Sequence, residues 1–109
     1  MASIQDNPWI AQVPALRKYL RISHPEFDAE IEALIGAACA DLARGGITPV
    51  KLYDVRDPLI ERAIALYVKA GFGLDNPDSA KYDEAYQAQR RDLMLTTEYI
   101  NAPAAEEDD

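Results

Sequence analysis

The sequence predicts an all-α protein, a small bundle of about four helices. Three observations predict it. Apolar residues recur every three or four positions in several segments, and prolines and glycines divide the chain between those segments. The length of 109 residues is that of one domain, with room for a modest core. We expect residues 1–100 to form this domain.

The first predicted helix covers residues 14–20. Pro14 stands in its opening turn, and Leu16 and Leu20 lie one turn apart. A helix this short depends on packing against the rest of the domain. Residues 1–13 have no clear period, so we expect them to form an N-terminal arm.

The second predicted helix, residues 25–44, has the strongest helical pattern. Proline and acidic residues stand at its start, and Gly45 follows its end. The run of small residues at 36–40 thins the helix and would allow a neighbour to approach closely. The residues of its apolar stripe are Phe27, Ile31, Leu34, Ile35, Ala38 and Leu42.

Residues 46–56 fit either a loop or a short extended segment, and the sequence does not decide between them. A third helix is predicted from Asp57, a helix-capping residue followed by a proline, to a stop near residues 71–73. Its broad apolar face predicts the central helix of the domain. That face contains Leu59, Ile60, Ala63, Ile64, Tyr67 and Val68.

The last predicted helix begins with a second cap-then-proline pair, Asn76-Pro77, and continues to about Tyr99. Its apolar face is weak, so we expect one side to cover the core and the other to meet a partner. Residues 101–109 combine small residues, a proline and four acids, and predict a disordered acidic tail.

The charge balance bears on the possible partners. Lys and Arg number 11 against 19 Asp and Glu, a net charge of -8, of which the last four residues supply half. Binding to a phosphate backbone is disfavoured, because such binding depends on clustered cations. No stretch approaches the roughly 20 apolar residues that cross a bilayer, and no secretory signal is visible, so we expect no membrane contact and a cytoplasmic chain.

Few residues suit catalysis. The only histidine, His24, precedes a proline and is expected in a turn, and the only cysteine, Cys39, is expected as a small buried hydrophobe. No dinucleotide or phosphate-loop motif is present. We therefore expect no enzyme activity, no metal and no cofactor.

Two stretches carry a resemblance to a known family. The first is residues 16–38, a short basic helix followed by Asp28-Ala-Glu-Ile-Glu-Ala-Leu-Ile. The second is residues 57–73, followed by Asp75-Asn-Pro and a helix with Tyr82 and Tyr86. In order and spacing these resemble the phage head-tail connector family of adaptor, head-completion and DNA-packaging proteins. The resemblance covers about residues 14–100.

The resemblance implies a structural virion protein without catalysis. About twelve copies would form a ring beneath the portal protein, extend the DNA channel and offer a docking surface to tail-completion or stopper proteins. Packaged DNA would pass through without specific binding. The protein would reside in the head-tail neck of the virion, and in the host cytoplasm during assembly.

A closed ring requires two different patches on each copy. We expect one patch on the last helix and the other on the acidic side of the second helix, so that opposite charges meet between neighbours. The candidate interface residues, for subunit or portal contacts, are Glu30, Asp41, Tyr82, Tyr86, Arg90, Arg91, Tyr99 and Ile100.

Two other interpretations remain. The net charge of -8 is compatible with an acidic helical protein that mimics nucleic acid or regulates by binding. A small enzyme would depend on His24 and Cys39 alone.

Overall fold

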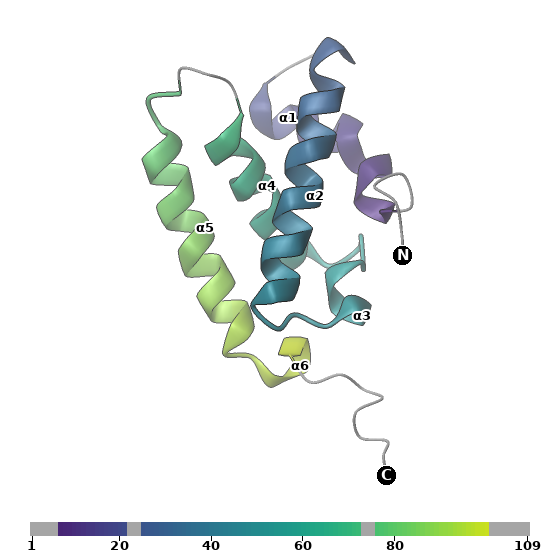
Figure 1. The fold of residues 1–109 in the computed structure, drawn as a ribbon, viewed down its shortest axis with the longest axis vertical. Helices are drawn as coiled ribbons and strands as arrows, with labels where there is room; N and C mark the ends of the chain where they lie inside the picture. The colour runs from purple at the N-terminus through teal and green to yellow at the C-terminus, as the bar shows by residue number, and fades with distance from the viewer. Residues whose placement is uncertain (1–6, 22–24, 73–75, 101–109) are drawn as a thin grey trace.

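The computed structural model describes residues 7–21, 25–72 and 76–100, and every regular element within them is helical. The predicted all-α bundle is confirmed (Figure 1). None of the described helices is both long enough and apolar enough to cross a membrane. The four longer helices are α1 (Val13–Leu20), α2 (Asp28–Arg44), α4 (Pro58–Gly71) and α5 (Ser79–Met94).

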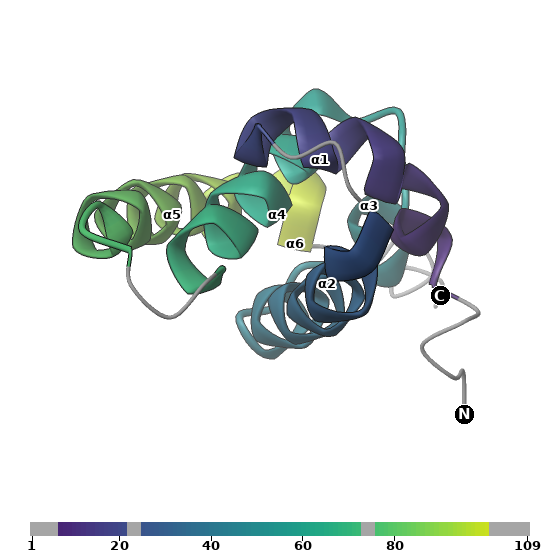
Figure 2. The same cartoon turned by 90° about the horizontal axis from the view of Figure 1, so that it is seen from above.

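Helix α4 is the centre of the bundle, as its broad apolar face predicts. It contacts α1, α2 and α5, and in the view from above it lies between α2 and α5 (Figure 2). Six of its 14 residues are buried. Leu59, placed on the apolar face by the sequence, is instead 45% exposed at the start of the helix.

The start of α4 is the predicted cap. Asp57 Oδ1 accepts hydrogen bonds from the backbone N–H groups of Leu59 at 2.9 Å and Ile60 at 3.4 Å, and Pro58 occupies the first turn. These N–H groups would otherwise lack partners at the helix terminus.

Helix α2 packs its predicted stripe against α4, with one exception. Phe27 precedes the helix in a 3₁₀ turn, Pro25–Phe27, and its ring packs edge-on against Phe72 at 5.5 Å between centroids. It is 37% exposed, so the apolar period begins one turn later than expected. The buried residues of α2 are Ile31, Ile35, Ala38, Cys39 and Leu42.

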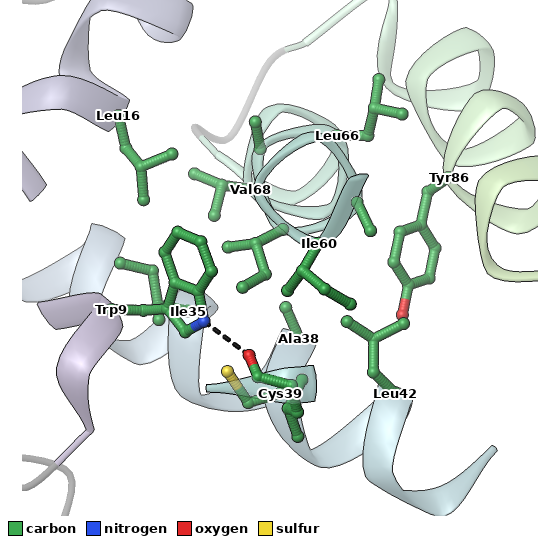
Figure 3. Packing of buried hydrophobic residues seen from close by; sticks show 14 of the residues in the cluster. Trp9, Leu16, Ile35, Ala38, Cys39, Leu42, Ile60, Leu66, Val68 and Tyr86 are labelled. Carbon is green, nitrogen blue, oxygen red and sulfur yellow. Dashed lines mark hydrogen bonds between the residues drawn. The ribbon is translucent and has the colours of Figure 1, made fainter. Parts of the chain in front are cut away.

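The described part of the predicted N-terminal arm packs into the core. A 3₁₀ helix, Pro8–Gln12, carries Trp9, which is fully buried, and its indole N–H donates to the carbonyl of Leu52 at 2.7 Å (Figure 3). Leu52 ends α3 (Pro49–Leu52), a single helical turn within the segment that the sequence left undecided. Trp9 thus ties the N-terminal segment to α3.

The prediction of one continuous last helix to Tyr99 is wrong. Helix α5 ends at Met94, and after a turn at residues 95–96 the chain forms α6 (Thr97–Ile100). The Thr96 hydroxyl donates to the Asp92 carbonyl at 2.8 Å, which closes the end of α5. The break redirects the chain so that Tyr99 is buried in the core.

The pair Asn76-Pro77 also acts differently from the prediction. The Asn76 side-chain amide donates to the Lys69 carbonyl at 2.7 Å, so it satisfies the end of α4. Helix α5 begins later, at Ser79, and the Asp78 side chain makes no capping hydrogen bond. A cap-then-proline pattern therefore marks a turn here. The predictions for His24 and for residues 101–109 lie outside the described residues.

Candidate functional site

One carboxylate, that of Asp41 on α2, joins α2 to α5. The Tyr86 hydroxyl donates to Asp41 Oδ2 at 2.6 Å, and Arg90 Nε lies 3.0 Å from the same oxygen. Arg44, one turn along α2, pairs with the other carboxylate oxygen. Tyr86 is almost fully buried and reaches from α5 toward Leu42 of α2 (Figure 3). We name Asp41, Tyr86 and Arg90 the Asp41 cluster.

Protonation in the Asp41 cluster follows from its partners. Burial on its own would raise the pKa of Asp41, but the Tyr86 hydroxyl and the guanidiniums of Arg90 and Arg44 hold that pKa below its usual value. Burial and the hydrogen bond to the carboxylate raise the pKa of Tyr86 well above that of a free tyrosine. The cluster is therefore a carboxylate with a neutral phenol at neutral pH.

The ends of two α5 side chains pack against Gly45 at the end of α2. A Cβ atom at this position would lie 2.8 Å from Arg90 Nη2 and 2.9 Å from the Met94 sulfur, closer than van der Waals contact allows. Arg90 Nη2 donates to the Asp41 carbonyl at 3.3 Å. Arg90 Nε meets Asp41 Oδ2 at close range without hydrogen-bond geometry, so its buried N–H has no acceptor.

The Asp41 cluster changes the interpretation of three candidate interface residues. The sequence predicts that Asp41 and the arginines of the last helix meet across neighbouring copies. Within a single chain, Asp41 already pairs with Arg90 and Tyr86. These residues link α2 to α5 within the bundle, so their opposite charges are already paired in a single copy.

A second carboxylate links the middle and the end of the chain. Asp57 caps α4 with Oδ1, while its Oδ2 accepts a hydrogen bond of 2.7 Å from the Tyr99 hydroxyl. The Tyr99 carbonyl in turn accepts from the Thr48 backbone N–H at 2.9 Å. Lys51 of α3 pairs with Glu98 of α6 at 2.8 Å. Tyr99, a candidate interface residue, is thus a buried anchor for α6.

The other candidate residues are more accessible. Tyr82 is half-buried, with the Lys69 ammonium 4.5 Å from its ring centroid. Glu30, Arg91 and Ile100 are exposed. The structure therefore leaves these three on the surface.

Besides the candidate Ile100, two exposed apolar side chains that sequence reasoning missed belong to the same end of the bundle. Val50 of α3 is 64% exposed, Leu95 after α5 is 82% exposed and Ile100 of α6 is 37% exposed. Helices α3 and α6 lie together at one end of the bundle (Figure 1). We name these three residues the α3/α6 end. The usable signal was that Leu95 falls outside the stripe of the last helix.

The candidate catalytic thiol is buried. Cys39 is 1% exposed, and the Asn7 side-chain amide donates to its sulfur at 3.4 Å. Burial raises the pKa of the thiol, against a smaller opposing effect of the Asn7 hydrogen bond, so the neutral thiol is favoured. The predicted small buried hydrophobe is confirmed. Within residues 7–21, 25–72 and 76–100 no group of acids, His or Cys could hold a metal ion.

Both polar clusters connect helix to helix, and the class of protein that the described residues define is a small all-helical bundle. Residues 14–100 match the family model described as phage connector protein, and the chain belongs to that family. No curated protein and no solved structure matches the chain. The predicted family is confirmed, and with it a structural virion role for this all-helical protein.

Proposed function

We propose that copies of this chain close into a ring of about twelve beneath the portal protein. The ring would extend the DNA channel and present a docking surface to a tail-completion or stopper protein. The observation that carries the proposal is membership of the connector family over residues 14–100, nearly the whole described domain. Assembly would take place in the host cytoplasm before the protein is fixed in the virion neck.

The surface of the bundle supports this role. At the α3/α6 end, three apolar side chains stand in solvent at one end of a helical body. Large apolar side chains left in solvent are candidates for contact surfaces. We assign this end to contact with a neighbouring ring of the virion neck. The contacts between copies within the ring would then use the sides of the bundle.

The charged candidates for the sides are Glu30 of α2 and Arg91 of α5, both exposed. A ring interface is heterologous, so an acidic patch on one copy can meet a basic patch on the next. Asp41 and Arg90 pair with each other within the chain, so we do not assign the contact between copies to them.

The net charge of -8 suits a channel that DNA traverses. A lining rich in Lys and Arg would release counterions and hold the phosphate backbone, whereas an acidic lining would not. The alternative of a nucleic-acid mimic requires acids spread over a continuous free surface. Several acids of the described residues are used internally: Asp28, Asp41, Asp54 and Glu98 in ion pairs and Asp57 as a helix cap. The connector is therefore the better interpretation.

The test is assembly with the portal protein. Native mass spectrometry and negative-stain imaging of the mixture should show closed rings or capped portals. Arg91→Glu should lower the yield of rings at least tenfold while the melting temperature of the monomer stays unchanged. Lys18→Glu, the same reversal of charge on an exposed residue of α1, is the matched control and should assemble normally. If the mixture contains only free chains and bare portals, the ring proposal is wrong.

The α3/α6 end has its own test. Leu95→Asp places a charge on a side chain that is already 82% exposed, so folding should be unaffected. We expect portal capping or tail attachment to fail while rings of the variant still form. Normal capping and tail attachment by this variant would remove the α3/α6 end from the proposal.

A further inference from the structure

The end of the bundle opposite α3 and α6 carries an open groove of about 430 Å³. It lies where the C-terminal ends of α1 and α4 approach the start of α5 (Figure 1). Three aromatic rings and two cations contribute to its lining, together with one acid. These residues are Tyr19, Phe72 and Tyr82, Arg21 and Lys69, and Asp78.

The two cations are available to a ligand. Most arginines of the chain are engaged by carboxylates, as Arg17 is by Asp28. Among the described residues, however, no carboxylate forms an ion pair with Arg21 or Lys69, and Lys69 lies over the ring of Tyr82. The charged lining residues sum to +1, two cations against Asp78, on a chain whose net charge is -8. The described charged residues of the lining thus carry one net positive charge, opposite in sign to that of the whole protein.

Arg21 has an unusual backbone conformation at the rim of the groove. Its φ of 59° lies in the left-handed region at the end of α1, a position where glycine is the usual residue. A residue with a Cβ atom costs roughly 1 kcal/mol more than glycine there. The chain therefore accepts strain at the rim of the groove where the arginine side chain is exposed.

We propose that this groove binds residues 101–109 of a second copy of the chain. The segment reads Asn-Ala-Pro-Ala-Ala-Glu-Glu-Asp-Asp, four acids preceded by a proline between alanines. Proline-containing extended segments dock into aromatic-lined grooves, and the acids that follow can pair with adjacent cations. Pro103 would lie against the rings, and Glu106 and Glu107 would meet Lys69 and Arg21.

A chain does not fill its own groove in this way. Tyr82 lies 12 residues of helix from the end of α5 at Met94, which is about 18 Å. Ile100 lies near that same end, in α6, and Pro103 follows it by three residues that reach at most about 10 Å. The segment of a second copy can reach the groove where that copy places its α6 end beside the groove end of the first. Each copy would thus present a groove at one end of the bundle and, at the other end, a segment that fills the groove of another copy.

This contact joins copies end to end, goes beyond the side-to-side contacts of the proposed ring and does not depend on them, because a peptide can occupy the groove of a free chain. The test uses a synthetic peptide of residues 101–109, titrated into the ¹⁵N-labelled full chain by NMR. The labelled chain carries Glu106→Gln, Glu107→Gln, Asp108→Asn and Asp109→Asn, so its own segment does not compete. The expected shifts are confined to residues around Lys69, Phe72 and Tyr82.

Three variants sharpen the test. Lys69→Glu should weaken peptide binding at least tenfold. Lys69→Met removes the charge, keeps a long unbranched side chain and should weaken peptide binding several-fold. Arg62→Glu, on an exposed residue near the other end of α4, is the matched control and should bind normally.

Two results would overturn the inference. One is equal affinity for a peptide with Gln and Asn in place of the four acids. The other concerns the NMR signals of the groove residues in the unmodified chain and in the neutralised chain. If these signals differ by an amount that does not change with protein concentration, the segment lies in the groove of its own chain. Failure of the peptide to bind would leave the ring standing, whereas missing rings with normal peptide binding would remove the ring alone.

Discussion

Tyr99 and Asp57, 42 residues apart in the chain, are joined by a buried hydrogen bond of 2.7 Å. Because the other oxygen of Asp57 caps α4, the start of the central helix and the last described helix share one carboxylate. The side chain that orders α4 therefore also holds α6 in place. The exposed Ile100 of the α3/α6 end follows Tyr99 directly.

Tyr99→Phe tests this link. The variant removes the hydroxyl that Asp57 accepts from, and a hydrogen bond to a charged group contributes about 1.5–3 kcal/mol. We expect the free energy of unfolding, measured by urea titration, to fall by about that amount with an unchanged slope. Tyr53→Phe, at an exposed tyrosine near α3, is the control and should change the free energy little. Equal effects of the two variants would contradict the assignment.

The Asp41 cluster predicts opposite outcomes for two adjacent arginines. Arg90→Glu places a second carboxylate beside Asp41 and leaves Tyr86 next to two like charges. The expected loss of unfolding free energy is about 2 kcal/mol or more. Arg91 is exposed, so Arg91→Glu should cost less than about 0.5 kcal/mol. Thermal unfolding followed by circular dichroism compares the two, and similar melting temperatures would contradict the internal role of Arg90.

This contrast also shows how far sequence patterns reach. The start of α4 and the buried face of α2 depend on residues a few positions apart, and both were predictable. Arg90 and Asp41 are 49 residues apart, and their pairing depends on the packing of α5 against the end of α2. Periodicity alone places both residues on polar helix faces, which explains why they were assigned to an intermolecular surface.

The break before α6 also depends on contacts between residues that are far apart in the chain. Nothing local in residues 95–96 is a strong helix breaker. Helix formation competes there with the burial of Tyr99, the bond from Thr48 to its carbonyl and the bond to Asp57. These partners come from distant parts of the chain, so only the folded structure reveals them. Trp9 was likewise assigned to an arm because its acceptor belongs to Leu52.

The raised pKa of Tyr86 predicts a loss of stability at alkaline pH. An unfolded tyrosine releases its proton near pH 10, while burial and the Asp41 carboxylate keep Tyr86 protonated in the folded chain to higher pH. Above about pH 10 the unfolded state therefore binds fewer protons, and the free energy of unfolding falls as pH rises, by up to about 1.4 kcal/mol per unit. The stability that the protonated Tyr86 hydroxyl contributes is fully present below about pH 10.

Tyr86→Phe isolates this effect. The variant lowers stability at neutral pH, because the bond to Asp41 is lost, but its free energy should decline less steeply above about pH 10 than that of the unmodified chain. Urea titrations at several pH values measure both slopes. If the free energy of unfolding falls equally with pH in the two proteins, the proton of Tyr86 does not contribute to the loss of stability at alkaline pH.

Trp9 supplies the last prediction, because it is the only tryptophan and is fully buried. Trp9→Phe removes the indole N–H that donates to Leu52 and leaves part of its volume empty between the N-terminal segment and α3. Lost packing and an unmet carbonyl together should lower the free energy of unfolding by about 2–4 kcal/mol. Circular dichroism is the suitable measurement, since the variant has no tryptophan fluorescence. Phe27→Leu, at a 37% exposed ring, is the control and should cost less than half as much. A stable Trp9→Phe variant would mean that the N-terminal segment is dispensable for the core.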